Sequence, residues 1–596
     1  MTTIHDLREA VENVARITDA WGSNRNSLDA GAVSSLSDAD ICDIDAIVAR
    51  FSAAQKRLHC IRVDLLAAAN SVRPVNQLPD EILRMVFAHH AYDDGYLYVF
   101  RGHNVPHPTS ILASVCSRWR ALALGNPALW TRINVTTSTF QLNTLRTRFG
   151  ELPLYLAYRR QSTCSTTKVL SFLQHTFTQV KSLVLDDLSP YDSDPVTEFL
   201  MDGYAPRLEE CVAFSNGADW SQPLFANGAP RLRHLELIGI TLPWSKLLFK
   251  NLLTLVVTLG QIVLPIGMDI CDVLRASPGL DILQLEIPRR DLDDTLQNVY
   301  AVNTSPCEPR ASLANLRILR LRLPLACILH IFSSIAMPSV RILELRLPDI
   351  LNDDESRLLS SLFSPGMPSA AVFQAITHFK VVLSRQDHDL HPIFEGFAED
   401  GSMVFFLEWE DMTSFQGSDV PAVHSVTSNL CENYLAPTIR KLTLESSFHQ
   451  CDHPLMPLLH LQSLRALTLK GHRRASVLCA EFLLEAALAL PPELDELELR
   501  EFSLDEDALA ALVEWSASAG HALSTTRLVD LAFDVASQEH VRDALRDMRR
   551  TVTRVEASCA SCFEQQVLCR CEHCLGPYVP SPVIHPTTNW DLSHQQ

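Results

Sequence analysis

The residues best suited to chemistry lie near the C-terminal end, in the stretch CASCFEQQVLCRCEHC. It contains two Cys-x-x-Cys pairs: Cys559 with Cys562, and Cys571 with Cys574. Because two such pairs can supply the four thiolates of a tetrahedral site, the pattern predicts a structural zinc ion. Two nearby residues, Cys569 and His573, could substitute as the fourth ligand. A cysteine cluster without metal, in a disordered tail over 555–596, is the alternative.

A second group of reactive side chains, FHQCDH, brings His449, Cys451 and His453 together in the sequence. It directly follows a leucine-rich segment, and the Cys and His of nucleophilic sites usually come from distant parts of a chain. We therefore interpret it as a polar loop. The sequence also lacks the phosphate-binding, dinucleotide-binding, nucleophile-elbow and HExxH motifs. We expect a protein that is not an enzyme and requires no cofactor.

These candidate residues belong to a large acidic chain, whose composition limits its fold and its partners. Its 596 residues, 47% of them hydrophobic, are enough for about three or four folded units. A formal charge of -20 argues against nucleic acid and anionic membranes as partners. We find no secretory signal and no apolar run of about 18 residues, so no membrane contact is expected. Scattered single cysteines suit a reducing compartment, and we expect a cytoplasmic and/or nuclear protein.

Residues 37–72 have apolar side chains at steps of three and four, which predicts one long amphipathic helix. Ser37 is a suitable N-terminal cap, and Pro74 prevents the helix from continuing. Two interpretations stay open: a helix packed on the following domain, or a short dimerising coiled coil. Residues 1–36 are expected to be flexible.

Two shorter amphipathic segments follow, LPDEILRMVFAHH and PTSILASVCSRWRALALGNPALW, separated by a loop over 88–108. Pro79 suits the start of the first helix, and Gly125 to Pro127 suit the end of the second. Apolar residues recur along one side of each helix. Such a small aromatic-rich unit usually needs a partner surface.

Together the two segments resemble the F-box family, whose pattern combines Leu-Pro-x-Glu-Ile-Leu, then Val-Cys-x-x-Trp and a closing Leu-Trp. The resemblance covers residues 74–135. It implies a helical element that binds the Skp-type adaptor of a cullin–RING ubiquitin ligase, with large apolar side chains as anchors. The residues that this predicts at the adaptor interface are Leu78, Pro79, Ile82, Leu83, Phe87, Val115, Cys116, Trp119 and Trp130.

Residues 150–550 contain a repeated L-x-x-L-x-L frame. Clear copies begin at Leu232, Leu252, Leu280, Leu316, Val340, Ile439, Leu464, Leu494 and Leu528, and weaker copies at Val180, Leu208, Ile376 and Val404. Alternating leucines of a strand point to one core, and each unit buries that face only against its neighbours.

This pattern predicts an α/β fold: a short helical F-box element followed by an irregular leucine-rich-repeat-like solenoid with a parallel sheet. The segments 287–312, 352–375 and 384–436 are expected to be insertions, because they are too long for simple returns. A parallel-stranded α/β domain of another topology is the alternative.

Residues that alternate with the strand leucines should line the open face of this sheet. Arg320, Arg322 and Arg346 lie in adjacent repeats, and their guanidinium groups suit an acidic or phosphorylated segment of a substrate protein. Pairing with Glu344 on a neighbouring strand is the alternative. Taken together, the features predict a substrate-recognition subunit of a ubiquitin ligase, whose partners are an adaptor, a cullin and a protein substrate. A non-catalytic F-box scaffold acting outside the ligase is the alternative function.

Overall fold

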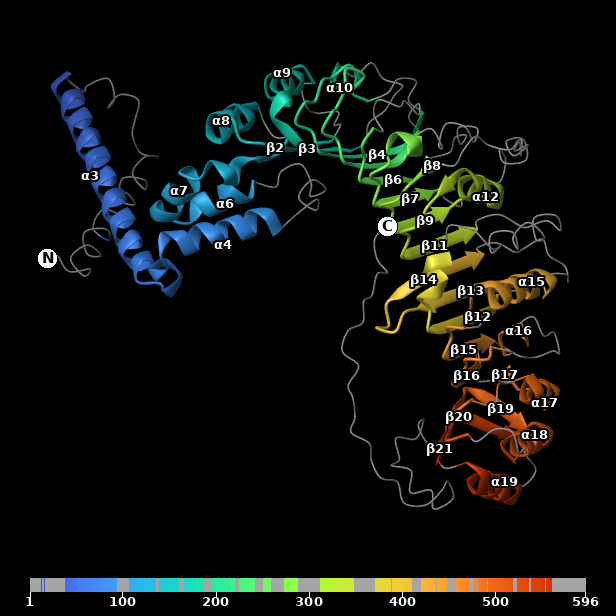
Figure 1. Ribbon diagram of the computed structural model, residues 1–596. Helices are drawn as coiled ribbons and strands as arrows, with labels where there is room; N and C mark the ends of the chain where they lie inside the picture. Colours follow the sequence, from blue (N-terminus) through green and yellow to red (C-terminus); the bar gives the residue numbers. More distant parts are fainter. Residues whose placement is uncertain are drawn as a thin grey trace, which may run out of the picture. The chain divides into compact units, whose positions relative to one another are not determined.

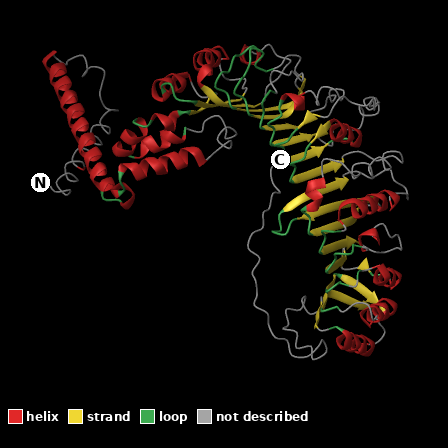
Figure 2. Ribbon diagram, viewed as in Figure 1, coloured by secondary structure: helices red, strands yellow, loops and turns green. Residues whose placement is uncertain are grey.

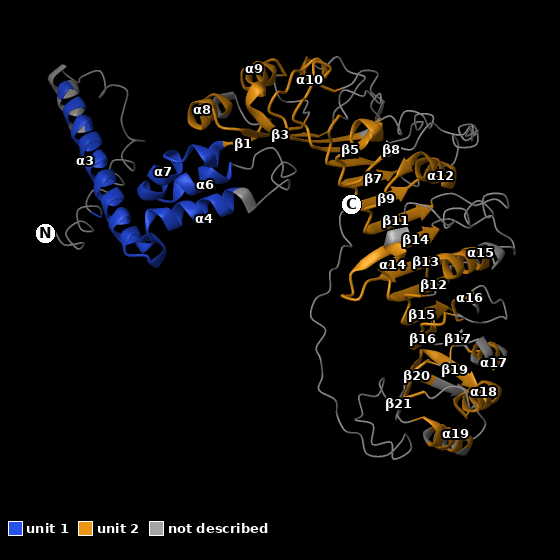
Figure 3. Cartoon of the chain, in the orientation of Figure 1, with its two compact units in different colours: residues 1–98, 105–130 blue, residues 99–104, 131–596 orange. Residues whose placement is uncertain are grey.

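The computed structural model divides the chain into two compact units, which are described separately (Figure 3). Unit 1 comprises residues 1–98 and 105–130, and unit 2 comprises residues 99–104 and 131–596. The structure describes residues 38–93, 107–135, 139–159, 166–186, 195–219, 224–241, 250–258, 273–287, 311–347, 370–386, 389–409, 420–435, 437–446, 456–459, 461–471, 476–478, 480–489, 491, 493–517, 523–534, 538–552 and 554–559, together with Glu12 and Arg16. The predicted flexible segment 1–36 and most of the tail lie outside these residues.

Unit 1 is helical in the part that the structure describes. Its elements are α3 (Asp38–Ser71), the 3-10 helix η2 (Pro74–Gln77), α4 (Asp80–Asp93), α6 (Pro108–Val115), α7 (Ser117–Leu124) and the 3-10 helix η3 (Pro127–Trp130). Helix α3 is the long helix predicted at 37–72. Helices α4, α6 and α7 and the turn η3 contact one another and form a small interior.

The second predicted helix of unit 1 is interrupted at Cys116. There the backbone is extended, with φ -157° and ψ 171°, so that α6 ends and α7 begins one residue later. The Cys116 sulfur accepts a hydrogen bond from the Trp119 backbone N–H at 3.4 Å and caps α7. The sequence predicts a single helix for this second segment, which contains Cys116, and the structure corrects this. The apolar spacing continues across the break, so periodicity alone does not reveal it.

Unit 2 is built on a large, mostly parallel sheet of 19 strands (Figure 1). The strands are β1 (Arg132–Asn134), β2 (Leu154–Arg159), β3 (Val180–Asp186), β4 (Glu210–Asp219), β5 (His234–Thr241), β6 (Thr254–Thr258), β7 (Ile282–Glu286), β9 (Ile318–Arg322), β11 (Ile342–Leu347), β12 (His378–Gln386), β13 (Asp389–Phe397), β14 (Met403–Trp409), β15 (Lys441–Ser446), β16 (Ala466–Gly471), β17 (Ser476–Val477), β18 (Glu496–Arg500), β19 (Phe502–Asp505), β20 (Thr525–Asp534) and β21 (Arg554–Cys559). A separate parallel pair joins β8 (Ala311–Ser312) to β10 (Ile335–Ala336).

Helices lie along one side of this sheet (Figure 2). They are α8 (Thr139–Phe149), α9 (Thr166–Thr176), η4 (Phe177–Gln179), α10 (Pro195–Met201), α12 (Leu325–Ser334), α14 (Ala370–Gln374), α15 (Val420–Leu430), the π-helical turn η8 (Cys431–Leu435), α16 (Met456–Leu459), α17 (Ala480–Ala489), α18 (Glu506–Ala517) and α19 (Gln538–Thr551). The strands alternate buried and half-buried residues, as expected when one face packs on a core.

The strand pairing places the repeated leucines in register. Leu235, Leu255 and Leu283 are aligned across β5, β6 and β7, and the row continues through Leu319 and Leu343. All five side chains are buried. Strands therefore form where the L-x-x-L-x-L frame predicts them, because each L-x-L pair completes a continuous apolar core.

Two of the predicted frames are shifted in the structure. In β20 the residues aligned with Leu497 and Leu499 are Thr526 and Leu528, so the frame begins at Leu523 and not at Leu528. In β14 the residues aligned with Leu343 and Leu345 are Phe405 and Leu407, so the frame begins at Ser402 and not at Val404. The predicted frame was misplaced in β20 because a polar residue, Thr526, occupies one of its core positions. A run of apolar residues concealed the frame in β14.

The predicted insertion 384–436 is not a long excursion, since it contributes β13, β14 and the end of β12 to the sheet. The strand order is β11, β14, β13, β12, β15, with β13 antiparallel to both of its neighbours. Gly396 in β13 packs so closely that an added Cβ would lie 2.6 Å from the Ile376 side chain. Because glycine has no Cβ, it permits β13 to pack this closely against the Ile376 side chain. The other two predicted insertions lie mostly outside the described residues.

Candidate functional site

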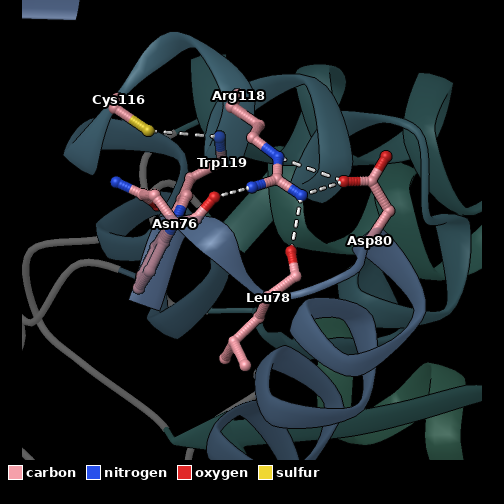
Figure 4. Close-up of polar contacts among 6 residues, drawn as sticks. All are labelled: Asn76, Leu78, Asp80, Cys116, Arg118 and Trp119. Carbon is pink, nitrogen blue, oxygen red and sulfur yellow. Dashed lines mark hydrogen bonds and ion pairs between the residues drawn. The ribbon is translucent and has the colours of Figure 1, made fainter. Parts of the chain in front are cut away.

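In unit 1 a single arginine joins the start of α4 to α7 (Figure 4). The Arg118 guanidinium donates to the Leu78 carbonyl at 2.7 Å and, through Nε, to Asp80 Oδ1 at 3.1 Å. A third donor reaches the Asn76 carbonyl. The planar fork of arginine suits this arrangement, since it can satisfy several acceptors at fixed angles. Arg118 thereby fixes the Leu-Pro segment against the second helical piece.

Trp119 complements this contact from the neighbouring position. Its indole N–H donates to the Asn76 side-chain oxygen at 2.6 Å, and its ring centroid lies 4.8 Å from that of Phe87. Its side chain is half-buried, so the indole both closes the small interior and reaches its edge. Trp119 holds η2, α4 and α7 together.

Three of the nine residues predicted at an adaptor interface lie in the interior of unit 1. Leu83 and Phe87 are fully buried, and Trp130 is nearly so. The Trp130 indole donates to the Ala123 carbonyl at 2.8 Å and stacks on His107, with ring centroids 5.5 Å apart. In this structure the three side chains hold the helices together and present almost no surface to a partner. Leu78, Cys116 and Trp119 are half-buried.

The remaining predicted interface residues are exposed: Pro79, Ile82 and Val115. Their exposure is unusual for apolar side chains, since Val115 leaves 49% of its surface accessible. The structure adds three exposed apolar residues that we did not place at the interface, Met85, Val86 and Ile111.

These exposed residues form two helix faces. Ile82, Met85 and Val86 follow the i, i+3, i+4 spacing on α4, while Ile111 and Val115 are one turn apart on α6. Helices α4 and α6 contact each other. The signal for Met85 and Val86 was present in the sequence, as the continuation of the Ile82 face.

The exposed face of the sheet in unit 2 carries two aligned rows of mostly charged residues. One row runs through Glu236, Val256, Gln284, Arg320, Glu344, Phe406, Glu395, Lys380, Thr443, Thr468 and Glu498. The next runs through Glu286, Arg322, Arg346, Glu408, Ile393, Val382, Glu445, Lys470 and Arg500. Acidic and basic residues are interspersed along both rows, with at most two charges of the same sign in succession, so this face has no extended region of one charge.

The three arginines predicted to bind substrate lie within these rows. Arg320 Nε is 3.1 Å from one oxygen of Glu344, and Arg346 Nη2 is 2.9 Å from the other. Arg346 also approaches Glu408 at 3.7 Å and lies over the Phe406 ring. Arg322 is aligned with Arg346 on the adjacent strand. The structure thus shows the pairing with Glu344 that was the alternative to a free basic surface.

Further along this face, His378 is enclosed by other polar groups. Its Nε2 lies 3.0 Å from Thr443 Oγ1, and its ring stacks on Phe397. Burial, reinforced by Lys441 and Lys380, lowers the pKa of His378 to about 4. The imidazole is therefore neutral near neutral pH.

At the N-terminal end of the sheet, one row of the exposed face changes from polar to buried apolar residues. Ala157, Val184 and Val212 continue the row of Glu236 on strands β2, β3 and β4, and all three are buried beside Phe214. The charged residues of this row consequently begin at β5. Next to it, burial and the nearby Glu210 raise the pKa of Glu236.

The predicted zinc site lies almost entirely outside the described residues. Cys559 ends strand β21, and Cys562, Cys571 and Cys574 fall beyond it. Within the residues that the structure describes, no cluster of three or more metal-binding side chains is found. The FHQCDH stretch also falls outside them.

Comparison with protein families matches residues 75–136 to the family model described as F-box-like. The match coincides with the segment in which α4, α6, α7 and η3 pack together. No curated protein matches the chain. Of the helices that the structure describes, none has the length and apolar character needed to cross a membrane. Residues 75–136 are therefore an F-box-like domain, a protein-interaction module, and the sequence after it forms a large mixed α/β unit.

Proposed function

We propose that the chain is the substrate-recognition subunit of a cullin–RING ubiquitin ligase. The F-box-like domain docks on a Skp-type adaptor, and unit 2 holds the protein substrate. The observation that carries this proposal is the pair of exposed apolar helix faces inside the F-box-like match. Such a subunit needs no catalytic residues, because it acts by holding a substrate close to the transfer machinery. It would work in the cytoplasm and/or the nucleus.

The docking face in this proposal consists of Pro79, Ile82, Met85, Val86, Ile111 and Val115. An apolar helix face entering a groove is a common recognition mode, and burying a Met, Ile or Val side chain contributes about 1.5–3 kcal/mol. The buried residues Leu83, Phe87 and Trp130 serve the same function indirectly, since they hold α4 and α6 in position. This division assigns binding and folding to different side chains.

Unit 2 in this proposal is a leucine-rich-repeat-like solenoid. Support comes from the parallel register of the L-x-L pairs and from the position of the helices on one side of the sheet. Its exposed face carries interspersed acidic and basic side chains, which suits a protein segment that presents both signs of charge. Arg320, Arg322 and Arg346 could change partners from acids of the sheet to acids of such a segment.

Adaptor binding is tested with the full chain co-expressed with a Skp-type adaptor. The double variant Ile82→Glu, Val115→Glu should lose the adaptor, because two carboxylates would enter the apolar contact. Leu152→Glu, at an exposed apolar residue of unit 2, is the matched control and should bind normally. A folded double variant that still binds the adaptor would overturn the docking face.

Recovery of a cullin together with the adaptor distinguishes the ligase from its alternative. If the adaptor binds and no cullin follows under conditions in which a known F-box subunit recovers both, the chain is an interaction scaffold outside the ligase. For substrate binding, Arg320→Ala with Arg322→Ala should reduce retention of captured proteins. Unchanged retention by the folded variant would remove these arginines from the binding face.

A structural zinc ion in the tail is a separate part of the proposal, supported by the spacing of Cys559, Cys562, Cys571 and Cys574. Mass spectrometry of the reduced peptide 555–580 should show one bound zinc ion at neutral pH. A peptide that retains no zinc while a zinc-finger peptide in the same buffer does would exclude the site.

A further inference from the structure

Helix α3 carries a row of apolar residues on its exposed surface. From Phe51 onward, such residues recur at alternating steps of three and four. The row is Phe51, Ala54, Leu58, Ile61, Leu65 and Ala68, followed by Val72 directly after the helix end, and the same spacing extends back in the sequence through Ile47 and Ile44. The larger residues leave between 43% and 70% of their surface accessible. We call this row the α3 seam.

The α3 seam has the spacing of a coiled coil. Alternating steps of three and four average 3.5 residues, which keeps one row facing a partner helix along the whole length. From Ile44 to Ala68 the row spans 25 residues of sequence, or about 37 Å of helix. A partner helix of matching length covers such a narrow, straight row better than a globular groove does.

The sizes of the seam residues indicate how a partner is aligned. In a parallel pair of identical helices each residue meets its own copy, so Ala54 would face Ala54 and leave a gap. In an antiparallel pair, Ala54 of one copy faces Leu58 of the other, and Phe51 faces Ile61. Small residues then oppose large ones, which fills the interface evenly.

The charges beside the α3 seam favour the same alignment. In the antiparallel pair Arg50 of each copy lies beside Asp64 of the other, which gives two attractive contacts. The same arrangement brings the two Arg57 side chains together, which gives one repulsive contact. In a parallel pair Arg57 of each copy would lie beside Arg62 of the other, which gives two like-charge contacts. Charges at these flanking positions commonly decide helix orientation.

We infer that the chain forms a homodimer through an antiparallel coiled coil of two α3 helices. The dimer is independent of the F-box-like assignment, since it rests on α3 alone. It gives one assembly two F-box-like domains and two sheets.

Dimerisation is tested by light scattering of the full-length protein after size exclusion. Wild type should show twice the 66.5-kDa mass of one chain, and Leu58→Glu with Ile61→Glu should show a single chain. Val63→Glu is the matched control, because Val63 is 50% exposed and lies off the seam, so this variant should stay dimeric. A monomeric wild type would overturn the inference, as would a dimer that survives both seam substitutions. A monomer whose seam is protected from hydrogen exchange would instead show that the chain covers its own α3.

Orientation is tested by exchanging the two flanking charges. Asp64→Arg alone should raise the dimer dissociation constant by about threefold to tenfold, since it replaces two attractive contacts with two repulsive ones. Adding Arg50→Asp should restore the affinity, because the antiparallel pairs re-form with signs exchanged. If the second substitution restores nothing, the antiparallel alignment is wrong.

Discussion

The two units stabilise their structures in opposite ways. In unit 1 a few side chains perform unique tasks: Arg118 joins three backbone or side-chain acceptors, and Phe87 fills the middle of three short helices. In unit 2 the same task is repeated from strand to strand, as Leu255, Leu283 and Leu319 show. In a small unit without repeats, the loss of one core side chain destabilises the whole unit. In the repetitive sheet, the loss of one core side chain affects mainly the neighbouring strands. Substitutions should therefore act globally in the first unit and locally in the second.

The largest expected effect comes from Phe87→Ala in unit 1. The fully buried ring contacts Trp119, and its removal should cost about 3–5 kcal/mol and unfold the F-box-like domain. Hydrogen exchange should show loss of protection over α4, α6 and α7 together. The matching change in unit 2, Phe379→Ala, should lower protection only in β12 and the strands beside it. If the loss of protection extended over the whole unit in both variants, the proposed difference between the two units would be wrong.

Arg118→Ala should have the next largest effect. It removes the donors that Leu78, Asn76 and Asp80 share, at a cost of about 1–3 kcal/mol, and it should weaken adaptor binding although Arg118 need not touch the adaptor. Chemical denaturation and adaptor titration measure the two effects. Arg118→Lys keeps the charge without the fork and should recover only part of either. Full recovery with lysine would show that charge alone matters there.

Thr526→Val should stabilise unit 2 by about 1 kcal/mol. The Thr526 hydroxyl is buried and has no hydrogen-bond partner among the described residues, at a position where the other strands carry an apolar residue. Thr176→Val is the opposite control, because the buried Thr176 hydroxyl donates to the Phe172 carbonyl at 2.8 Å. Thermal unfolding should move upward for the first variant and downward for the second. A loss of stability with Thr526→Val would show that its hydroxyl has a role in the strand.

The smallest expected effect is a pH dependence that originates at His378. Its pKa is lowered to about 4 in the folded sheet, so the unfolded chain binds the proton more readily. The contribution to stability is complete above the ordinary histidine pKa of about 6.5 and is lost as the pH falls toward 4. Because the side chain is half-exposed, we expect a loss below about 1 kcal/mol. Denaturation curves of wild type and His378→Gln should diverge between pH 7 and pH 4, with the variant less sensitive to pH. Parallel curves would exclude His378 as the source.

Sequence periodicity predicted the sheet better than the details of unit 1. An L-x-L pair can bury both side chains in one way only, so the strands and most of their frames followed directly. The frame in β20 was missed because Thr526 occupies a leucine position, and β13 was missed because Pro392 and Gly396 interrupt any strand pattern. These are positions at which tertiary packing outweighs local preference.

The F-box-like segment was predicted in position, whereas the exposure of its side chains was predicted only in part. The motif located the correct segment, but a motif does not separate side chains that face a partner from those that face the interior. Leu83 and Ile82 are adjacent in the sequence, yet one is buried and the other is exposed. Nothing in the sequence indicated the role of Arg118, because its acceptors lie about forty residues earlier in the chain. Contacts of that range are invisible to helical periodicity.

The three strands β12, β13 and β14 also bear on how such a sheet changes its length. Because the outer two run in the same direction as the strands beside them, β11 and β15 each meet a neighbour of the usual polarity and register. Compared with a single strand at this place, the extra hairpin lengthens the sheet by two strands, or about 10 Å, without altering either flank. Any odd number of strands would fit in the same place. Evolution, or a protein engineer, can therefore lengthen the exposed face of the sheet here by adding a hairpin, while every other strand keeps its own partners.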